Sequence, residues 1–208
     1  MACGSAKVVA GLVSNKRPEI DLNGLTLQRY DRGRRFVCVF AMLGRVCCLM
    51  CCMPSAAEIT IRPAVASEAE HLSGLALRSK AHWGYSTEFL EACREELSYD
   101  SEYMRSNTVF VAESDAGIVG FYALERVSET EAELTAMFVE PERIGRRIGR
   151  ALISHAKETA RGHGFEAIVI QGDPNAVAFY QAAGGTRCGK RPSGSIPGRE
   201  LPLFRIQL

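Results

Sequence analysis

Three strand-like segments follow one another in the middle of the chain, and this run constrains the fold more than any other feature of the sequence. Residues 108–112, 118–124 and 132–139 are rich in β-branched and aromatic side chains, and a turn at 114–117 joins the first two segments into a hairpin. A doubly wound array alternates strands with helices and does not place three strands in succession. The run therefore argues against a Rossmann array and favours a mixed sheet.

Helical segments flank this run on both sides. Apolar spacing predicts helices over residues 66–80, 86–97, 148–160 and 173–183, and further strands over 59–62, 167–170, 186–190 and 203–207. The predicted order is β-α-α-β-β-β-α-β-α-β-β. We expect an α/β fold (an α+β mixed sheet) with a central sheet of roughly six to seven strands and about four flanking helices, formed by residues 57–208.

Residues 1–56 differ in composition from the rest of the chain. Most of the 8 cysteines precede Met53, and residues 36–53 form an apolar run that Arg45 interrupts. Such a run is too short and too charged for a spanning helix. We interpret this segment as an N-terminal extension, either poorly ordered or the product of a mis-assigned start with Met53 as the true beginning. A peripheral or lipid-modified anchor is the alternative.

The charge balance and the cysteines of the main domain exclude several functions. A formal net charge of +1 gives no global basic field, so neither a nucleic acid nor a membrane partner is expected. Cys93 and Cys188 alone form no disulfide framework, which favours a cytoplasmic protein. The C-x-x-C spacing within residues 47–52 lacks a second pair or a histidine, so no metal site is expected.

A loop rich in glycine and arginine connects the third strand of the central run to the next helix. The strand ends at Val139-Glu140-Pro141, and the loop reads Arg143-Ile144-Gly145-Arg146-Arg147-Ile148-Gly149. A diphosphate is best held by free backbone N–H groups at a helix N-terminus, where small residues let the backbone approach it. The loop therefore predicts an anion site. An ordinary helix start with a basic first turn is the alternative that this loop alone leaves open.

A second motif follows this helix and the next strand. Residues 171–180 read Gln-Gly-Asp-Pro-Asn-Ala-Val-Ala-Phe-Tyr, and Gly184-Gly185 end the segment. Together the two motifs resemble those of the GNAT superfamily of N-acetyltransferases, in particular its small-molecule-type members. Aligning Gly149 with the last glycine of the family motif places Ile144 at a Gln/Arg position and Arg147 at the central glycine. A positive φ at Arg147 would cost about 1–2 kcal/mol, which a phosphate contact would partly offset.

The resemblance implies an acyl-CoA N-acyltransferase fold in which the strand half from Met137 to Val139 splays from its neighbour, with acetyl-CoA as the cosubstrate. It implies that Tyr180 protonates the leaving thiolate and that Asn175 contacts the pantetheine arm, while packing on the sheet is the other reading of Tyr180. An amide of Phe138 or Val139 would polarise the thioester oxygen. The implied cofactor-binding residues are Met137, Phe138, Val139, Ile144, Gly145, Arg146, Arg147, Ile148, Gly149, Arg150, Asn175 and Tyr180.

The acceptor is expected to be a small-molecule primary amine that attacks directly in a ternary complex. Glu133 is the first candidate for the base and Glu131 the second, and a solvated carboxylate at a strand edge is the alternative interpretation of both. Trp83 and Tyr85 line an acceptor pocket or pack the helix junction. A homodimer is left open. A non-catalytic acyl-CoA-binding regulatory module is the alternative function, and a P-loop protein is disfavoured because no G-K-[ST] follows the glycines.

Overall fold

The computed structural model describes residues 59–208, and these form a mixed sheet with helices on both faces. The predicted extension at residues 1–56 lies outside the described residues. The strands are β1 (Thr60–Pro63), β2 (Thr108–Ser114), β3 (Gly117–Arg126), β4 (Glu131–Val139), β5 (Ala167–Gln171), β6 (Thr186–Pro192) and β7 (Glu200–Gln207). The helices are α2 (Ala69–Ala81), α3 (Thr87–Ala92), α4 (Ser101–Ser106), α5 (Ile148–Gly162) and α6 (Val177–Ala182), with short 3₁₀ turns η1 (Ala66–Glu68), η2 (Pro141–Arg143) and η3 (Pro174–Ala176).

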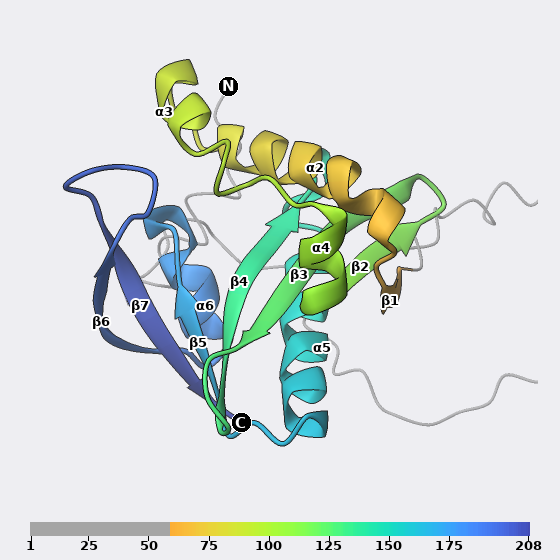
Figure 1. Cartoon of the computed structure of the whole chain (residues 1–208), viewed down its shortest axis with the longest axis vertical. Coiled ribbons are helices and arrows are strands. Elements are labelled where there is room, and N and C mark those ends of the chain that lie inside the picture. Colours follow the sequence, from red (N-terminus) through yellow and green to blue (C-terminus); the bar gives the residue numbers. More distant parts are fainter. Residues whose placement is uncertain (1–58) are drawn as a thin grey trace, which may run out of the picture. The chain divides into compact units, whose positions relative to one another are not determined.

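The seven strands lie in the order β1-β2-β3-β4-β5-β7-β6 (Figure 1). All neighbouring strands are antiparallel except β4 and β5, which run parallel. A parallel pair needs a crossover connection, and α5 supplies it. The predicted α/β class and the mixed sheet are confirmed.

Helices cover the sheet on both faces and enclose two apolar cores. α2 and α4 pack on one face, and α5 and α6 pack on the other. In α5 the apolar side chains recur every four residues, which places them on one side of the helix, and Ile148, Leu152, Ala156 and Ala160 are all buried against the sheet. The helix predicted from this spacing is therefore confirmed.

A bulge in β4 separates the two halves of that strand. Ala123 of β3 pairs with Ala136 and Leu124 pairs with Leu134, so Thr135 is an extra residue in β4. Leu134 packs in the core beneath α5, whereas Ala136 packs in the core beneath α2, although residues two apart normally share a face. Because bulges bend a strand and increase its twist, this one redirects β4 at its middle.

The gap between β4 and β5 begins at this bulge. β4 pairs with β5 only from Glu131 to Glu133, opposite Ala167–Val169, and the two strands then diverge (Figure 1). The remaining part of β4, from Leu134 to Val139, is paired on one side only, with β3. The sequence prediction had placed the start of the divergence at Met137, and the structure places it earlier because the bulge lies at Thr135.

Two helical segments differ from their predicted extents. α4 was missed, because its two turns bury only Met104 fully and so show no apolar periodicity. The predicted helix over residues 86–97 begins as expected, with the Ser86 side chain accepting from the Phe89 amide at 3.2 Å, but α3 ends at Ala92. Cys93 and Leu97 are nevertheless buried, so the apolar spacing was read correctly while the backbone continues in turns.

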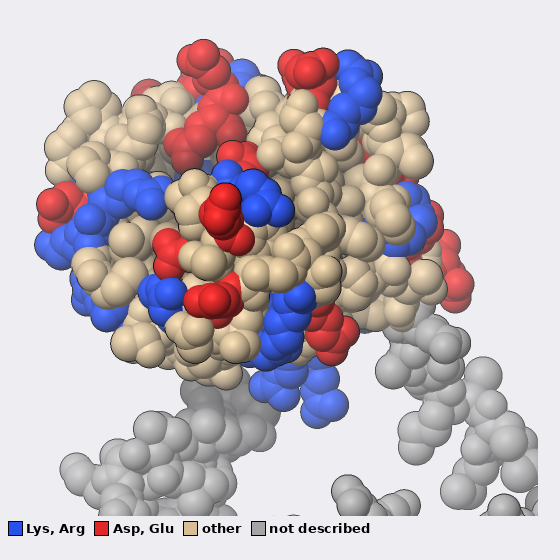
Figure 2. Space-filling view, turned by 60° about the horizontal axis from the view of Figure 1, so that its bottom comes forward, with Lys and Arg blue, Asp and Glu red and all other residues tan. Residues whose placement is uncertain are grey.

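The surface of this domain carries both signs of charge. On the face shown in Figure 2, lysine and arginine side chains are interspersed with acidic ones. Within residues 59–208 no helix is long and apolar enough to cross a membrane.

Candidate active site

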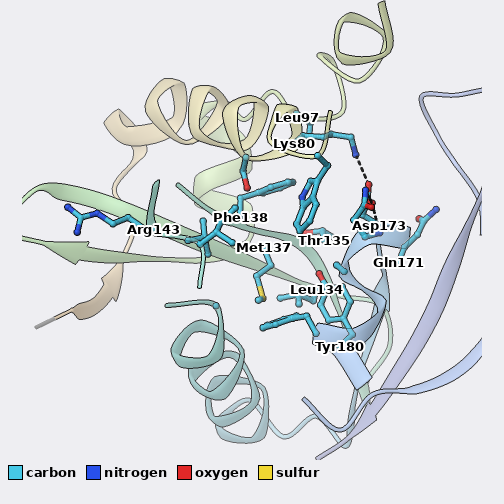
Figure 3. A pocket seen from close by; sticks show the side chains of 18 of the residues that line it. Lys80, Leu97, Leu134, Thr135, Met137, Phe138, Arg143, Gln171, Asp173 and Tyr180 are labelled. Carbon is cyan, nitrogen blue, oxygen red and sulfur yellow. Dashed lines mark hydrogen bonds and ion pairs between the residues drawn. The ribbon is translucent and has the colours of Figure 1, made fainter. Parts of the chain in front are cut away.

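A cavity of about 470 Å³ occupies the gap between β4 and β5. Its walls come from α2, β4, the start of α5, and the segment from the end of β5 into α6. Figure 3 shows Arg143 at one end of this cavity, Asp173 and Gln171 at the other, and Met137 and Phe138 of β4 between them. The residues of the two sequence motifs therefore meet in one cavity.

The backbone of β4 has unpaired groups facing this cavity. The Glu140 amide donates to the Val119 carbonyl at 2.9 Å, directly beyond the register pair of Gly120 and Val139. In an antiparallel pair of strands, residues that bond to the neighbouring strand alternate with residues whose N–H and C=O groups point away from it. The backbone groups of Phe138, like those of Glu140, therefore face β3, and those of Met137 and Val139 face the open side. We infer from this alternation that Val139, rather than Phe138, presents an amide to a ligand.

The loop before α5 has the conformation of an anion-binding turn. Gly145 has φ of 84° and Arg147, the N-cap of α5, has φ of 66°, which makes Arg147 the one non-glycine residue with positive φ in the described structure. The first intrahelical donor is the Ala151 amide, which reaches the Arg147 carbonyl at 3.1 Å. The amides before it in the first turn are free, as the first amides of any helix are, and no acidic residue lies in that turn.

Close packing explains the glycine that begins this helix. A β-carbon at Gly149 would lie 3.3 Å from the Phe179 ring and 3.9 Å from the terminal methyl group of Met137. The distance to Met137 is an ordinary contact, but the Phe179 ring would have to shift by a few tenths of an ångström to admit a side chain at this position. The glycine keeps the free amides of the helix close to the cavity.

Three arginines surround this end of the cavity. Arg143, Arg147 and Arg150 line it, and none of them forms an ion pair with any residue in the range 59–208. Arg146, which was predicted with them, does not line the cavity. Ile144 and Gly145 do, whereas the Ile148 side chain is buried in the core below. Free amides and unpaired guanidinium groups together fit a diphosphate.

Tyr180 of α6 contributes a buried phenol to the wall of the cavity. It is only 8% exposed, its ring lies 5.7 Å from that of Phe204, and its hydroxyl has no hydrogen-bond partner in the described structure. Burial, with a smaller contribution from the charge of Asp173, raises the pKa of Tyr180 to about 12. The phenol is therefore protonated at neutral pH and can donate a proton.

A cluster centred on the Tyr85 hydroxyl closes the other end of the cavity. This hydroxyl donates to Asp173 at 2.8 Å and accepts from Arg199 at 2.8 Å and from the Asn175 amide group at 3.1 Å. The Arg199 guanidinium also lies 4.8 Å from the Phe89 ring, which is stacked on Tyr85. We call Tyr85, Asp173, Asn175 and Arg199 the clasp, because they tie together the loops after α2, β5 and β6.

Burial within the clasp raises the pKa of Tyr85, and the hydrogen bond to Asp173 adds to this effect, while Arg199 opposes it. Lys80 completes the local charge balance at 3.7 Å from Asp173. Asn175, which was expected to contact the pantetheine arm, borders the cavity, but its side-chain N–H groups donate hydrogen bonds to Tyr85 and Asp173.

Of the remaining predicted residues, Trp83 lines the main cavity, Glu133 lines an adjoining cavity, and Tyr85 and Glu131 line neither. Trp83 lines the main cavity and is 45% exposed, whereas Tyr85 does not line it. Glu133 lies in an adjoining cavity, and its carboxylate accepts from Arg191. Glu131 pairs with Arg205 at 2.9 Å, away from both cavities. Of the two candidate bases, the structure thus brings only Glu133 close to the site.

Sequence reasoning missed Lys80 and Asp173 as parts of this site, and it missed the contact between Arg199 and Tyr85. Arg199 and Tyr85 are 114 residues apart in the chain, so no local pattern links them. Asp173 was read only as a residue that opens a helix, and it does cap η3 by accepting from the Asn175 amide at 2.9 Å. Its second role, accepting the hydrogen bond from Tyr85, can be recognised only in the folded structure, where the two loops lie side by side.

Comparison with known proteins shows which family this domain resembles. The model of the acetyltransferase (GNAT) domain family matches residues 105–184, which include β4, the arginine loop and Tyr180. This match supports membership of the chain in the GNAT superfamily. The family and the enzyme class predicted from the sequence, an acetyl-CoA-dependent acetyltransferase, are thus confirmed.

One curated relative of this GNAT protein is the 5-NmdU N-acetyltransferase of Pseudomonas phage PaMx11. The two are 29% identical over 148 residues, which is 71% of this chain and 98% of the phage protein. The alignment therefore spans nearly the whole relative.

Solved structures share the fold of this GNAT domain. The PaiA N-acetyltransferase of Thermoplasma acidophilum, solved with coenzyme A, has a TM-score of 0.60 at 21% identity, covering 73% of this chain and 99% of that one. A GCN5-related N-acetyltransferase of Rhodopseudomonas palustris has a TM-score of 0.61 at 20% identity, covering 72% and 95%. A GNAT acetyltransferase of Elizabethkingia anophelis, solved with acetyl-CoA, has a TM-score of 0.52 at 18% identity, covering 72% and 98%.

Proposed function

We propose that this protein transfers the acetyl group of acetyl-CoA to a primary amine by direct attack in a ternary complex. The observation that carries the proposal is the cavity itself. It joins the open edge of β4, a helix N-terminus with three arginines that form no ion pair within residues 59–208, and a buried protonated tyrosine. Acetyl-CoA supplies an activated acetyl thioester, and the residues of the chain bind, orient and exchange protons around it.

Binding is divided between the loop and the strand. The free amides from Arg147 to Arg150, with the guanidinium groups of Arg143 and Arg147, would hold the diphosphate. The open backbone groups of Met137 and Val139 would pair with the amides of the pantetheine arm as an added strand does. The Val139 amide is the proposed donor to the thioester oxygen, where negative charge develops.

Two proton movements accompany the transfer. The amine nitrogen forms a bond to the acetyl carbon as the carbon–sulfur bond breaks, the amine loses one proton, and the leaving thiolate gains one. Tyr180 is the proposed donor to the thiolate. Glu133 is the proposed acceptor of the amine proton, directly or through water, and its ion pair with Arg191 holds its carboxylate in place.

The decisive experiment follows CoA release by the full chain with acetyl-CoA and a panel of amines, and identifies the acetylated product by mass spectrometry. Because the name of the phage relative gives 5-NmdU as its substrate, 5-NmdU belongs in this panel beside small aliphatic amines and amino acids. Formation of an N-acetyl product supports the proposal. Binding of CoA without turnover of any amine would contradict it and favour a regulatory module.

Glu133→Gln tests the assignment of the base. A base role predicts a fall in kcat of about 100-fold or more, with a change in the pH–rate profile. An increase in KM for the amine alone, with kcat retained, would instead assign Glu133 to binding.

A further inference from the structure

Tyr180 packs against a glycine that directly follows β5. A β-carbon at Gly172 would lie 3.0 Å from two carbons of the Tyr180 ring, Cδ2 and Cε2, and 3.2 Å from the Phe204 ring. Contacts this short are rare for real β-carbons, so the ring would have to shift by a few tenths of an ångström. Gly172 does not have a positive φ, so the left-handed conformation does not explain it. The space that Tyr180 occupies does.

Hydrogen bonds fix the backbone on both sides of this contact. The Gly172 amide donates to a carbonyl of β7 at 2.9 Å. At the end of α6, the Gly185 amide donates to the Tyr180 carbonyl at 2.8 Å. The Lys157 ammonium of α5 also donates to the Ala183 carbonyl at 2.9 Å. Because β5 and α6 are both held, the Tyr180 side chain is the part that would move to admit a methyl group.

The cavity is the side toward which this ring can move. The Tyr180 ring lies 5.7 Å from the Phe204 ring and 5.3 Å from the Phe179 ring, and the residue is only 8% exposed. Tyr180 lines the main cavity, and Figure 3 shows its side chain extending into it. A displaced ring therefore moves toward the proposed position of acetyl-CoA, and its hydroxyl moves with it.

We propose that Gly172 is a positioning residue for acetyl transfer, because it leaves the space in which the Tyr180 phenol is held at the leaving thiolate. This inference rests on the proposed function. It adds a residue that lines neither cavity and therefore acts through Tyr180 alone. A general acid must lie within hydrogen-bond reach of the atom that it protonates. A misplacement of about 1 Å can cost about 100-fold in rate, so a smaller shift still has a measurable effect.

Gly172→Ala tests this role with acetyl-CoA and the amine of the panel that is acetylated fastest. We expect kcat to fall about tenfold, with the KM for the amine and the Kd for CoA within about twofold of the parent values. The same change in the Tyr180→Phe background should alter kcat by less than about twofold, because the phenyl ring carries no proton to misplace. The loss of stability, about 5 °C in Tm, should appear in both backgrounds, since the two rings fill the same space.

Gly162→Ala is the matched control. A β-carbon at Gly162, the last residue of α5, would have no atom within 4 Å among those considered. This variant should keep the parent kcat and a Tm equal to or slightly above that of the parent.

Crystal structures of the parent and of Gly172→Ala with bound CoA provide a test that does not depend on turnover. The Tyr180 hydroxyl should be displaced toward the cavity in the variant, while the first turn of α5 keeps its position.

The outcomes separate this inference from the proposed function. A parental kcat in Gly172→Ala, an equal loss of kcat in the parent and Tyr180→Phe backgrounds, or an unmoved Tyr180 ring would overturn the positioning role while acetyl transfer by the parent stands. A full rate in Tyr180→Phe would overturn the positioning role together with the acid role. Absence of acetyl transfer to every amine, with CoA bound, would instead overturn the proposed function, and the crystal structures would still decide whether Gly172 holds the ring.

Discussion

Arg147 is the residue at which local strain and ligand binding meet. It occupies the left-handed region at φ of 66°, where the superfamily motif has a glycine, and its side chain lines the cavity without an ion-pair partner in the described domain. A left-handed conformation costs a non-glycine residue about 1–2 kcal/mol. Retaining an arginine there is understandable if its guanidinium contacts a phosphate.

Two substitutions separate these effects. Arg147→Ala removes the charge and keeps the strain, whereas Arg147→Gly removes both. We expect both variants to weaken CoA binding about tenfold or more, because a charged hydrogen bond is lost, and only the glycine variant to regain about 1 kcal/mol of stability. Calorimetry and denaturant titration measure the two quantities. Arg161→Ala at the other end of α5 is the control, and tighter CoA binding by Arg147→Gly would refute the phosphate contact.

Tyr180 provides a prediction about pH. Because burial raises its pKa to about 12, the phenol keeps its proton far beyond neutral pH. A primary amine has a pKa of about 10.4, so the rate should rise with pH toward that value, with no loss attributable to Tyr180 below about pH 11. Steady-state rates between neutral pH and pH 10 measure this profile. An alkaline limb that disappears in Tyr180→Phe would mean that the tyrosine titrates lower than its burial implies.

Tyr180→Phe should lower kcat about 100-fold or more. Its hydroxyl has no described partner and its ring packs on Phe204, so the CoA affinity and the thermal stability should remain close to those of the parent. A variant that keeps its full rate would remove Tyr180 from the mechanism and leave it as a packing residue.

At the scale of elements, the sequence was most informative where a local pattern determines the structure. The strands β2, β3 and β4 and the helix α5 follow from β-branched runs and four-residue apolar spacing, and the structure has them with small changes at their ends. The start of the gap was not predictable, because it depends on the bulge at Thr135, which is defined by cross-strand register. The clasp was missed for a related reason, since its loops are distant in the chain and meet only in the fold.

Removing the Tyr85 hydroxyl tests whether the clasp holds its loops together. Tyr85→Phe deletes the hydroxyl that joins Asp173, Asn175 and Arg199 and should cost about 1–3 kcal/mol of stability, since the bonded groups include charges. We also expect faster amide exchange over residues 193–199 and a higher KM for the amine. Hydrogen exchange followed by mass spectrometry measures the change in amide exchange directly.

Tyr122→Phe is the matched control for this change. Its hydroxyl bonds to His155 at 2.8 Å and to Thr159 at 3.0 Å beneath α5, away from both cavities. The Tyr122→Phe variant should lose a comparable amount of stability, but amide exchange over residues 193–199 should stay at the parent rate. If Tyr85→Phe leaves exchange in that loop at the parent rate, the clasp does not hold the loop.

At the scale of the whole described domain, the gap divides the sheet into two parts. β1 to β4 form one part and β5, β7 and β6 the other, and the backbone ladder joins them only over Glu131 to Glu133. The core beneath α5 also connects them, since it contains residues from both parts, and so do the ion pairs of Glu131 with Arg205 and of Glu133 with Arg191. A ligand in the cavity would contact β4, α5 and α6 together, and so would add a further connection.

Coenzyme A should therefore stabilise the whole domain against unfolding. At a concentration of about 100 times Kd, a ligand specific for the folded state contributes about 2.7 kcal/mol, which corresponds to a rise in Tm of about 5–11 °C for a domain of this size. Thermal unfolding with and without CoA measures the shift. Pantetheine lacks the diphosphate, so it should produce a smaller rise at the same concentration, and Arg147→Ala should reduce the rise with CoA but not that with pantetheine. Equal shifts for the two ligands would mean that the arginine loop does not hold the phosphates, because binding would then depend on the open edge of β4 alone.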